Sequence, residues 1–401
     1  MQKLLISLLA GLAMLGPLAI DTYLPSFPAI GRAFDVGPLL VQQTLSIYLF
    51  GFAFLTLFYG TLSDSFGRRP VILVSLVVYV GASVGAALSP NFTWLLACRL
   101  IQGLAAGAGW VVGQAIVRDR LSGPPAQRAL ATIMMVFGLA PAIAPILGGW
   151  MQTYFGWQSI FVFLGTFGVL IFTVSYFALP ESLPLQARQR FHVGQICVNY
   201  WRALRHPQFL AVVLAIGVAF SGFGLYIGSA PYFIMDILGL PETGFGWLFL
   251  PLIGGMVAGS AVAARWSTQA TPETMIWSGY ATMATAALFN ISYNYFFVAA
   301  IPWAVAPVAV YAFGFSIAAP ALTVFALDLL SQNRGMAASL QSFVQLLAFS
   351  FVSGLVAPLL FSSALKLAYG VLGGLAISLV FWLLSRPKEG LQKPQENLPV
   401  S

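Results

Sequence analysis

The chain contains very few charged residues. Only 7% of its 401 residues are Asp, Glu, Lys or Arg, whereas 59% are hydrophobic. Soluble domains carry about 25% charged residues. A chain of this composition buries its surface in lipid rather than around a core in water, so the composition predicts an integral membrane protein.

Cysteine and histidine are scarce as well. Cys98 lies in an apolar run, while Cys197, His192 and His206 lie in one polar segment. Two cysteines cannot build a disulfide framework, and no group of residues has the spacing of metal ligands. We therefore expect no metal site and no cofactor. We also find no nucleophile motif and no phosphate-binding loop, so an enzyme is not indicated.

Long apolar runs fill most of the chain. A helix needs about 20 apolar residues to cross a hydrocarbon layer of about 30 Å. Twelve runs have about this length: 4–24, 39–59, 71–88, 93–117, 130–150, 160–179, 209–235, 246–264, 275–292, 297–327, 335–361 and 365–384. The first run also resembles a signal peptide, but it has no clear small-residue cleavage site and eleven runs follow it. The sequence predicts twelve transmembrane helices.

The basic residues predict the orientation. Of the 18 Lys and Arg residues, Arg99 lies within a run and only Arg32 and Lys366 face outward if the N-terminus is inside, which leaves 15 inside. The positive-inside rule therefore predicts that both termini lie in the cytoplasm. This distribution also explains the net charge of +7, so we expect the lipid bilayer as a partner and no nucleic acid.

The longest polar segment lies in the middle of the chain. It divides the chain into a six-helix half at 1–180, a cytoplasmic central loop at 181–207, a second six-helix half at 208–385 and a cytoplasmic tail at 386–401.

The most informative segment is residues 60–70, Gly-Thr-Leu-Ser-Asp-Ser-Phe-Gly-Arg-Arg-Pro, between the second and third runs. Gly60 would let two helices approach closely. Asp64 can sit against the positive end of a neighbouring helix, and the arginines hold the loop in the cytoplasm. The segment resembles, nearly residue for residue, the signature loop of the major facilitator superfamily; we call it the signature loop. Gly60, Asp64, Gly67, Arg68 and Arg69 match the family's positions.

Other motifs narrow the resemblance. Arg99, with Gln102 and Gly103, looks like the arginine motif of proton-coupled facilitators. Segment 140–149 looks like the proline–glycine motif of the antiporter branch, with Ala140 and Ala144 where glycines are usual; its matching residues are Pro141, Pro145, Gly148 and Gly149. With segments 21–28, 118–119, 155–161, 179–181 and 334–339, the chain resembles the Bcr/CflA group of drug–proton antiporters along essentially its whole length.

The resemblance implies an all-α fold of twelve transmembrane helices in two halves around a central cavity. It also implies proton-coupled efflux of drug-like compounds by alternating access across a bacterial inner membrane, with a small-molecule substrate and protons as partners. We expect the protein to act as a monomer. The alternative is proton-coupled transport of a specific metabolite, such as a nucleoside or a sugar, because the fold does not determine the substrate.

Asp21 and Arg99 are the clearest charged residues well inside predicted spans, where a charge costs roughly 2.5–3.5 kcal/mol. At ~1.5 Å per residue, Asp21 lies about 13 Å and Arg99 about 9 Å below the outer surface, so both can face one cavity. A carboxyl group removed from water holds its proton more tightly, and a nearby cation loosens that proton. We predict that Asp21 carries the proton and that Arg99 controls its release. The alternative is a static buried pair. Asp328 is a rival proton site, although a solvated cap or gate is the favoured interpretation there.

The resemblance also pairs Asp119 with Arg68. We expect Asp64, Arg68 and Asp119 to form a cytoplasmic latch that closes the outward-facing state, together with Gly60, Gly67 and Arg69 of the same loop.

Substrate contacts are predicted along one helix face and at three tyrosines. Gln102 and Trp110 follow Arg99 at helical spacing, and Tyr23, Tyr48 and Tyr226 combine an aromatic surface with a polar tip. Such a cavity favours bulky, lipophilic, neutral or cationic molecules. The alternative is that these aromatic residues face lipid or neighbouring helices.

Overall fold

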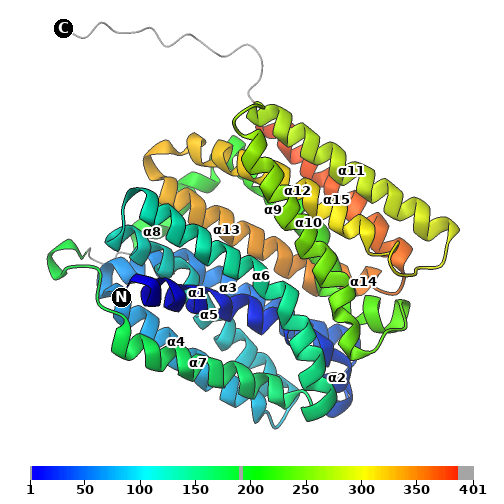
Figure 1. Ribbon diagram of the computed structural model, residues 1–401, viewed down its shortest axis with the longest axis horizontal. Helices are drawn as coiled ribbons and strands as arrows, with labels where there is room; N and C mark the ends of the chain where they lie inside the picture. The colour runs from blue at the N-terminus through cyan, green and yellow to red at the C-terminus, as the bar shows by residue number, and fades with distance from the viewer. Residues whose placement is uncertain (1, 189–192, 387–401) are drawn as a thin grey trace, which may run out of the picture.

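The computed structural model describes residues 2–188 and 193–386. All regular secondary structure in these two ranges is helical. Figure 1 shows two groups of helices side by side, with α1–α7 in one group and α9–α15 in the other.

The first group is the N-terminal half. It consists of α1 (Gln2–Asp21), η1 (Leu24–Ser26), α2 (Phe27–Phe34), α3 (Pro38–Phe66), α4 (Arg68–Ala87), α5 (Phe92–Arg120), α6 (Gly123–Phe155) and α7 (Gln158–Ala178). The segment that joins the halves contains η2 (Leu185–Ala187) and α8 (Val193–Leu204).

The second group is the C-terminal half. It consists of α9 (Pro207–Gly228), the π-helix η3 (Tyr232–Ile237), η4 (Glu242–Phe245), α10 (Gly246–Trp266), α11 (Pro272–Phe296), α12 (Ala306–Leu329), η5 (Ser331–Asn333), α13 (Arg334–Phe351), the π-helix η6 (Val352–Val356), α14 (Ala357–Leu360) and α15 (Ala364–Ser385).

Eleven helical segments in the described ranges are long and apolar enough to span a membrane. The remaining predicted span corresponds to α11, a less apolar helix of 25 residues that packs against α12 and α15. The predicted all-α membrane fold with six long helices in each half is therefore confirmed.

Prolines change the bounds of two predicted spans. The first span is interrupted, because α1 ends at Asp21 and the chain passes through η1 before α2 begins. Pro25 in η1 and Pro28 in the first turn of α2 have no N–H to donate, which favours such a break. The tenth span begins at residue 306 instead of 297, with Pro307 in the first turn, where a missing N–H is tolerated.

The central segment, predicted as a loop, contains α8. Cys197 therefore lies in a helix, although its side chain is outside the described residues, as is all of His192. The predicted tail at 386–401 also lies outside the described residues, apart from Arg386.

Glycines allow the helices of the N-terminal half to pack closely. A Cβ atom at Gly103 would overlap the backbone of Tyr48, and one at Gly107 would lie 2.9 Å from Oγ1 of Thr56. These contacts bring α5 close to α3. The expectation for Gly60 was wrong, because a Cβ atom there would meet nothing within 4 Å.

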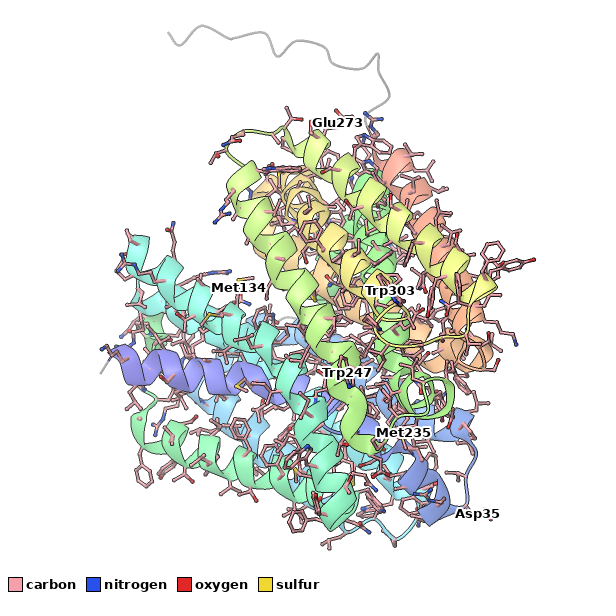
Figure 2. All side chains as sticks on the ribbon, turned by 45° about the vertical axis from the view of Figure 1, so that its right-hand side comes forward. Asp35, Met134, Met235, Trp247, Glu273 and Trp303 are labelled. Carbon is pink, nitrogen blue, oxygen red and sulfur yellow. The ribbon has the colours of Figure 1, made fainter. Side chains whose placement is uncertain are left out.

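The outside of the bundle is apolar. Met134 on α6, Trp247 on α10 and Trp303 before α12 are more than half exposed, at 60%, 56% and 57%. Figure 2 labels Met134 on the N-terminal half and Trp247 and Trp303 on the C-terminal half. Side chains of this kind are suited to contact with lipid tails.

The two halves meet through α3 with α13 and through α6 with α10 and η4. We call the end of the bundle that carries Arg68, Arg118 and Arg334 the basic end. The opposite end, which carries Asp35 and Glu242, is the far end.

Candidate functional site

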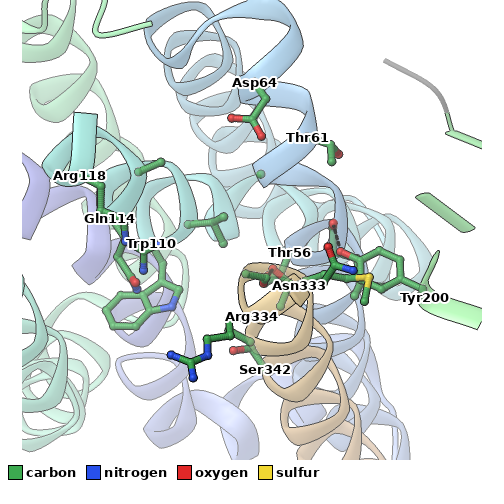
Figure 3. Close-up of a pocket in the computed structure, with 18 of the residues that line it drawn as sticks. Thr56, Thr61, Asp64, Trp110, Gln114, Arg118, Tyr200, Asn333, Arg334 and Ser342 are labelled. Atoms are coloured by element: carbon green, nitrogen blue, oxygen red, sulfur yellow. Dashed lines mark hydrogen bonds between the residues drawn. The ribbon is translucent and has the colours of Figure 1, made fainter. Parts of the chain in front are cut away.

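A cavity of about 700 Å³ lies between the two halves at the basic end (Figure 3). Thr56 and Gly60 of α3 and Trp110 and Gln114 of α5 form its wall in the N-terminal half. The opposite wall comes from α13, with Ser342 as one of its polar residues. Drug-sized ligands occupy pockets of about 300–1,000 Å³, so the cavity has the size of a site for a small molecule.

The charges of the cavity lie at its mouth. The charged lining residues stand at the ends of their helices; they are Asp64, Arg68, Arg118, Asp119 and Arg334. The deeper wall is uncharged and combines hydroxyl and amide groups with the indole of Trp110, whose ring centroid lies 4.4 Å from that of Phe137. A molecule that enters through the mouth would therefore pass the charged residues before it contacts the uncharged deeper wall.

The far end is closed by polar contacts between the halves. The Gln42 side-chain amide on α3 donates to the Gly228 carbonyl at 3.0 Å and to Oγ of Ser353 at 2.8 Å. One turn further along α3, the hydroxyls of Ser46 and Ser350 each donate to the other residue's carbonyl oxygen, at 2.9 and 2.8 Å. These bonds are short-range and reversible, which suits a gate that opens and closes.

The predicted antiporter motif forms part of the same closure. Pro141 and Pro145 lie inside α6, and Gly148 and Gly149 follow one turn later. A Cβ atom at Gly148 would overlap the backbone oxygen of Thr22, within the N-terminal half.

Gly149 makes the corresponding contact across the two halves. A Cβ atom there would overlap the backbone oxygen of Glu242 in η4. One turn along α6, the hydroxyl of Thr153 donates to the Glu242 carboxylate at 3.2 Å. Gly148 and Gly149 therefore connect the chain after α1 with the contacts that close the far end between the two halves.

Arg99 is enclosed within the N-terminal half. Its side chain is 0% exposed, and its guanidinium carbon lies 4.2 Å from the ring centroid of Tyr48 and 4.5 Å from that of Tyr23. Nη1 donates to Oε1 of Gln102 at 2.6 Å, and Gln102 in turn donates to Oγ of Ser83 at 2.8 Å. Nη2 has no hydrogen-bond partner among the described residues. The charge is stabilised by aromatic faces and neutral groups rather than by a carboxylate.

Asp21 is the last residue of α1 and is 3% exposed. Its carboxyl group makes no hydrogen bond or ion pair with any described residue, and it does not pair with Arg99. Tyr48 lies within electrostatic range of both residues. The alternative of a static Asp21–Arg99 pair was therefore wrong for this conformation. The guanidinium group of Arg99 contacts the two tyrosine rings and Gln102 instead.

The predicted substrate residues are not gathered in the cavity. Trp110 lines it, but Tyr23, Tyr48 and Gln102 are fully enclosed in the N-terminal half and Tyr226 in the C-terminal half. The phenolic oxygen of Tyr226 accepts a hydrogen bond from Asn290 at 2.8 Å.

Arg99, Gln102 and Trp110 were expected to line the cavity together along one face of α5, but only the part of that face around Trp110 does so. Arg99 and Trp110 point to nearly the same side of α5, but they are separated by about 17 Å along its axis. At the level of Arg99, the rings of Tyr23 and Phe161 fill the space. A substrate role for the enclosed residues stays a prediction for another conformation.

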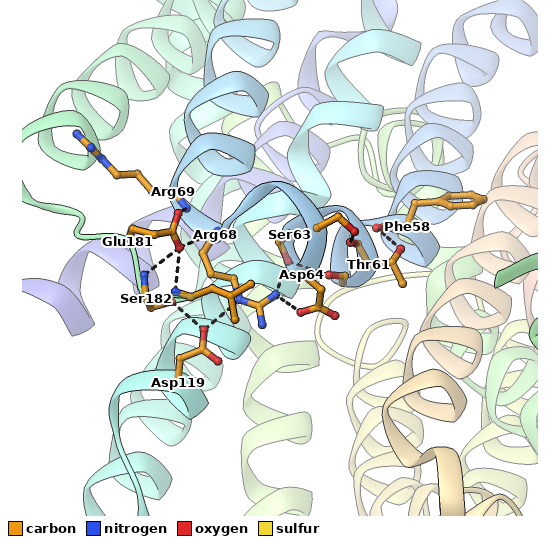
Figure 4. A network of polar contacts seen from close by, with 12 residues as sticks. Phe58, Thr61, Ser63, Asp64, Arg68, Arg69, Asp119, Glu181 and Ser182 are labelled. Carbon is orange, nitrogen blue, oxygen red and sulfur yellow. Dashed lines mark hydrogen bonds and ion pairs between the residues drawn. The ribbon is translucent and has the colours of Figure 1, made fainter. Parts of the chain in front are cut away.

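Three residues of the predicted latch lie together at the basic end (Figure 4). Nη1 of Arg68 lies 2.6 Å from Oδ1 of Asp64, and Nε of Arg68 lies 3.0 Å from Oδ2 of Asp119. The Arg68 side chain is 8% exposed. All three residues belong to the N-terminal half, and they are in contact while the cavity lies open beside them. Closure of the outward-facing state by this group stays a prediction.

Glu181 was missed as a site residue. Its carboxylate accepts hydrogen bonds from the backbone N–H groups of Arg68 at 3.0 Å and Arg69 at 3.3 Å, which begin α4. An anion at the N-terminus of a helix satisfies free donors there and interacts favourably with the helix dipole. Gly67 enters this contact with φ of +100°, a conformation that favours glycine. The signal for this contact in the sequence is the Leu-Pro-Glu segment at 179–181, which also contributes to the family resemblance.

The remaining charged candidates lie outside the enclosed regions. Arg69 donates to the Tyr176 carbonyl at 2.6 Å. Asp328 pairs with Arg334 at 2.8 Å, and both side chains are more than half exposed. This placement agrees with a solvated cap or gate rather than with an enclosed proton carrier.

The family model of the Major Facilitator Superfamily matches residues 9–353. The chain belongs to this superfamily. The prediction of a membrane transporter rather than an enzyme is therefore confirmed.

Relatives within the superfamily cover most of the chain. The Bicyclomycin resistance protein homolog of Haemophilus influenzae is 34% identical over 66% of this chain and 67% of its own length. The Uncharacterized MFS-type transporter YdgK of Bacillus subtilis is 31% identical over 88% of this chain and 89% of its own. The Multidrug resistance protein MdtL of Vibrio parahaemolyticus is 28% identical over 97% of both chains.

Solved structures show the same fold at low identity. A bacterial homolog of the human lysosomal transporter Spinster has a TM-score of 0.70 at 15% identity and covers 96% of this chain and 97% of its own. The human organic anion transporter MFSD10 (TETRAN) has a TM-score of 0.67 at 17% identity and covers 96% of this chain and 99% of its own.

We expect Arg68→Ala to slow transport by about tenfold or more, because it removes hydrogen bonds to two carboxylates, each worth roughly 1.5–3 kcal/mol when charged. Asp64→Asn should have a smaller effect, since Asp119 still binds Arg68. Arg128→Ala is the matched control, because Arg128 is an exposed arginine of α6 at the same end. Initial transport rates in reconstituted vesicles measure the effect. Full activity in Arg68→Ala and Asp64→Asn would reduce the signature loop of this superfamily member to a topology anchor.

Proposed function

We propose that the protein is a proton-coupled exporter of small lipophilic compounds that works by alternating access in a bacterial inner membrane. The observation that carries this proposal is the carboxyl group of Asp21, which is enclosed and has no partner among the described residues. Lipid-embedded carboxyl groups are costly to keep charged and mark proton pathways in transporters. In this conformation, a neutral, protonated Asp21 fits its surroundings.

The direction of the cycle follows from the position of Asp21. The next residue, Thr22, contacts Gly148, and the adjacent Gly149 contacts η4 of the opposite half. Opening of the far end separates these contacts and brings water toward Asp21. Water then delivers a proton from the outside to the Asp21 carboxylate as the compound leaves. When the far end closes and the cavity opens again to the cytoplasm, the next compound displaces this proton into the cytoplasm, and the charge of Arg99 stabilises the carboxylate that remains.

The distribution of charge supports the orientation. The basic end carries most arginines, so the positive-inside rule places it in the cytoplasm. The open cavity then faces the cytoplasm and receives compounds for export. The names of the relatives, which refer to bicyclomycin resistance and multidrug resistance, support this choice of substrate. We propose that one chain performs the whole cycle, because both walls of the cavity come from the same chain.

One observation favours the alternative of a specific metabolite. The deeper cavity wall offers several uncharged hydrogen-bonding groups, such as Thr56, Gln114 and Ser342. Such groups suit a nucleoside or a sugar as well as a polar drug.

Transport in proteoliposomes separates these functions. With an imposed gradient of about one pH unit, worth about 1.4 kcal/mol, exchange for one proton concentrates a neutral compound about tenfold. We expect this accumulation for bicyclomycin, its loss with a protonophore, and no accumulation of uridine or glucose. Accumulation of uridine alone would favour the metabolite function. Accumulation of bicyclomycin that does not depend on the gradient would contradict proton coupling.

A further inference from the structure

Helix α8 presents an unusual row of side chains to the outside. Val198, Trp201, Arg202 and Arg205 follow one another at i, i+3, i+4 and i+7, so they share one face of the helix and its end. Val198 is 46% exposed and Trp201 58% exposed, and both arginines are exposed as well. We call these four residues the α8 stripe. It combines two apolar side chains with two cations.

The opposite face of α8 is fixed against the bundle. The Tyr200 hydroxyl donates to the backbone oxygen of Leu57 in α3 at 2.8 Å, and Ala203 is 2% exposed. Burial raises the pKa of Tyr200 to about 12, so this hydroxyl keeps its proton and remains a donor. These contacts hold the α8 stripe in its outward direction.

The position of α8 along the bundle corresponds to the membrane boundary. Only Arg205 and His206 separate its end at Leu204 from the start of the spanning helix α9 at Pro207. Its contact at Leu57 lies nine residues before the end of α3 at Phe66, or about 13 Å along that helix. Therefore α8 lies beside the ends of the spanning helices rather than out in solution.

The charge of the α8 stripe is not neutralised by the protein. Acidic side chains at the basic end have arginine partners elsewhere: Asp64 and Asp119 pair with Arg68, Glu181 with Arg188, Asp328 with Arg334 and Glu273 with Arg386. No salt bridge to Arg202 or Arg205 occurs within the part of the chain that the structure describes. The Arg205 guanidinium lies 5.0 Å from the ring centroid of Trp201, which leaves its N–H groups available to an anion.

We propose that the α8 stripe binds the phosphate headgroups of anionic phospholipids. Arginine forms paired hydrogen bonds with phosphate oxygens, and Trp beside basic residues is typical of the membrane–water interface. Val198 and Trp201 enter the boundary between headgroups and acyl chains, as the apolar face of an interfacial helix does.

The position of the α8 stripe connects the lipid to the transport cavity. Asn199 and Tyr200, on the inner side of the same helix, line the cavity mouth between α3 and α13. Anionic lipid bound to the α8 stripe therefore keeps α8, and with it this part of the cavity mouth, at the level of the lipid headgroups.

Quenching of Trp201 by brominated lipids tests the proposal. The full chain is reconstituted in phosphatidylcholine vesicles that contain an equal mole fraction of either dibromo-phosphatidylglycerol or dibromo-phosphatidylcholine. The difference in emission between the wild type and Trp201→Phe isolates the Trp201 signal. We expect anionic lipid to be enriched about fivefold next to Trp201, the ratio given by one basic residue near an anionic surface.

Variants identify the groups responsible. The preference for anionic lipid should disappear in the double variant Arg202→Gln/Arg205→Gln. It should persist in Arg128→Gln, which changes an exposed arginine of α6 at the same end. The Trp201 signal of each variant is obtained by comparison with the same variant that also carries Trp201→Phe. Equal quenching of wild-type Trp201 by the two lipids overturns the proposal without any variant. Full preference in the double variant overturns it too. Neither result bears on the proposed export function, since no substrate is present.

Discussion

Asp21→Asn is expected to abolish proton-driven accumulation of the exported compound while the protein remains folded. Asparagine has the size of the protonated carboxyl group and cannot release a proton. Because Asp21 makes no hydrogen bond or ion pair with a described residue, the substitution removes no native contact of this conformation. Asparagine is uncharged, like the protonated carboxyl group of this conformation, so the charge of the enclosed site does not change. Thermal stability should therefore be unchanged.

Two measurements separate lost coupling from lost folding. Accumulation in proteoliposomes should fall to background in Asp21→Asn, while exchange of labelled against unlabelled compound without a gradient should continue. Asp35→Asn is the matched control, since Asp35 is exposed at the far end and its φ of 50° is tolerated by asparagine. Compound-induced proton release at the wild-type level in Asp21→Asn would refute the assignment and direct attention to Asp328.

The membrane explains why the helix count was predictable. A span must be long and apolar wherever it lies, so the runs are visible in the sequence. Their interruptions depend on local packing as well as on proline. Pro141 and Pro145 remain inside the continuous helix α6, whereas Pro25 lies where α1 gives way to η1. Proline alone therefore does not indicate whether a span is broken.

The candidate site was predictable where the partners are close in sequence. Asp64 and Arg68 lie four residues apart, and the resemblance supplied Asp119. Glu181 lies 113 residues after Arg68 and binds backbone N–H groups, which leave no pattern in the sequence. The surroundings of Arg99 were missed for a related reason. The depth of Arg99 along its own helix can be counted from the sequence. The side chains that neighbouring helices place at the same depth cannot be predicted in this way.

Gly149→Ala is expected to open the far end and to block transport. The added Cβ atom would overlap the backbone of Glu242, which cannot rotate away as a flexible side chain does. The displacement separates α6 from η4. If it breaks two of the hydrogen bonds between the halves, each worth about 1 kcal/mol, the closed form loses about thirtyfold in population. The contact lies between the halves, so the packing within each half is retained.

Gly138→Ala provides the matched control on the same helix, because a Cβ atom there meets nothing within 4 Å. Spin labels at positions 32 and 366, exposed at the far end of opposite halves, report the separation between them. In Gly149→Ala the distance distribution should move to longer values and accumulation should fall by about tenfold or more, in line with the lost closed form. Gly138→Ala should match the wild type in both measurements. An unchanged distance distribution with full transport in Gly149→Ala would show that the halves do not need this close approach. The closure would then rest on the hydrogen bonds between the halves, such as those of Gln42 and Ser46.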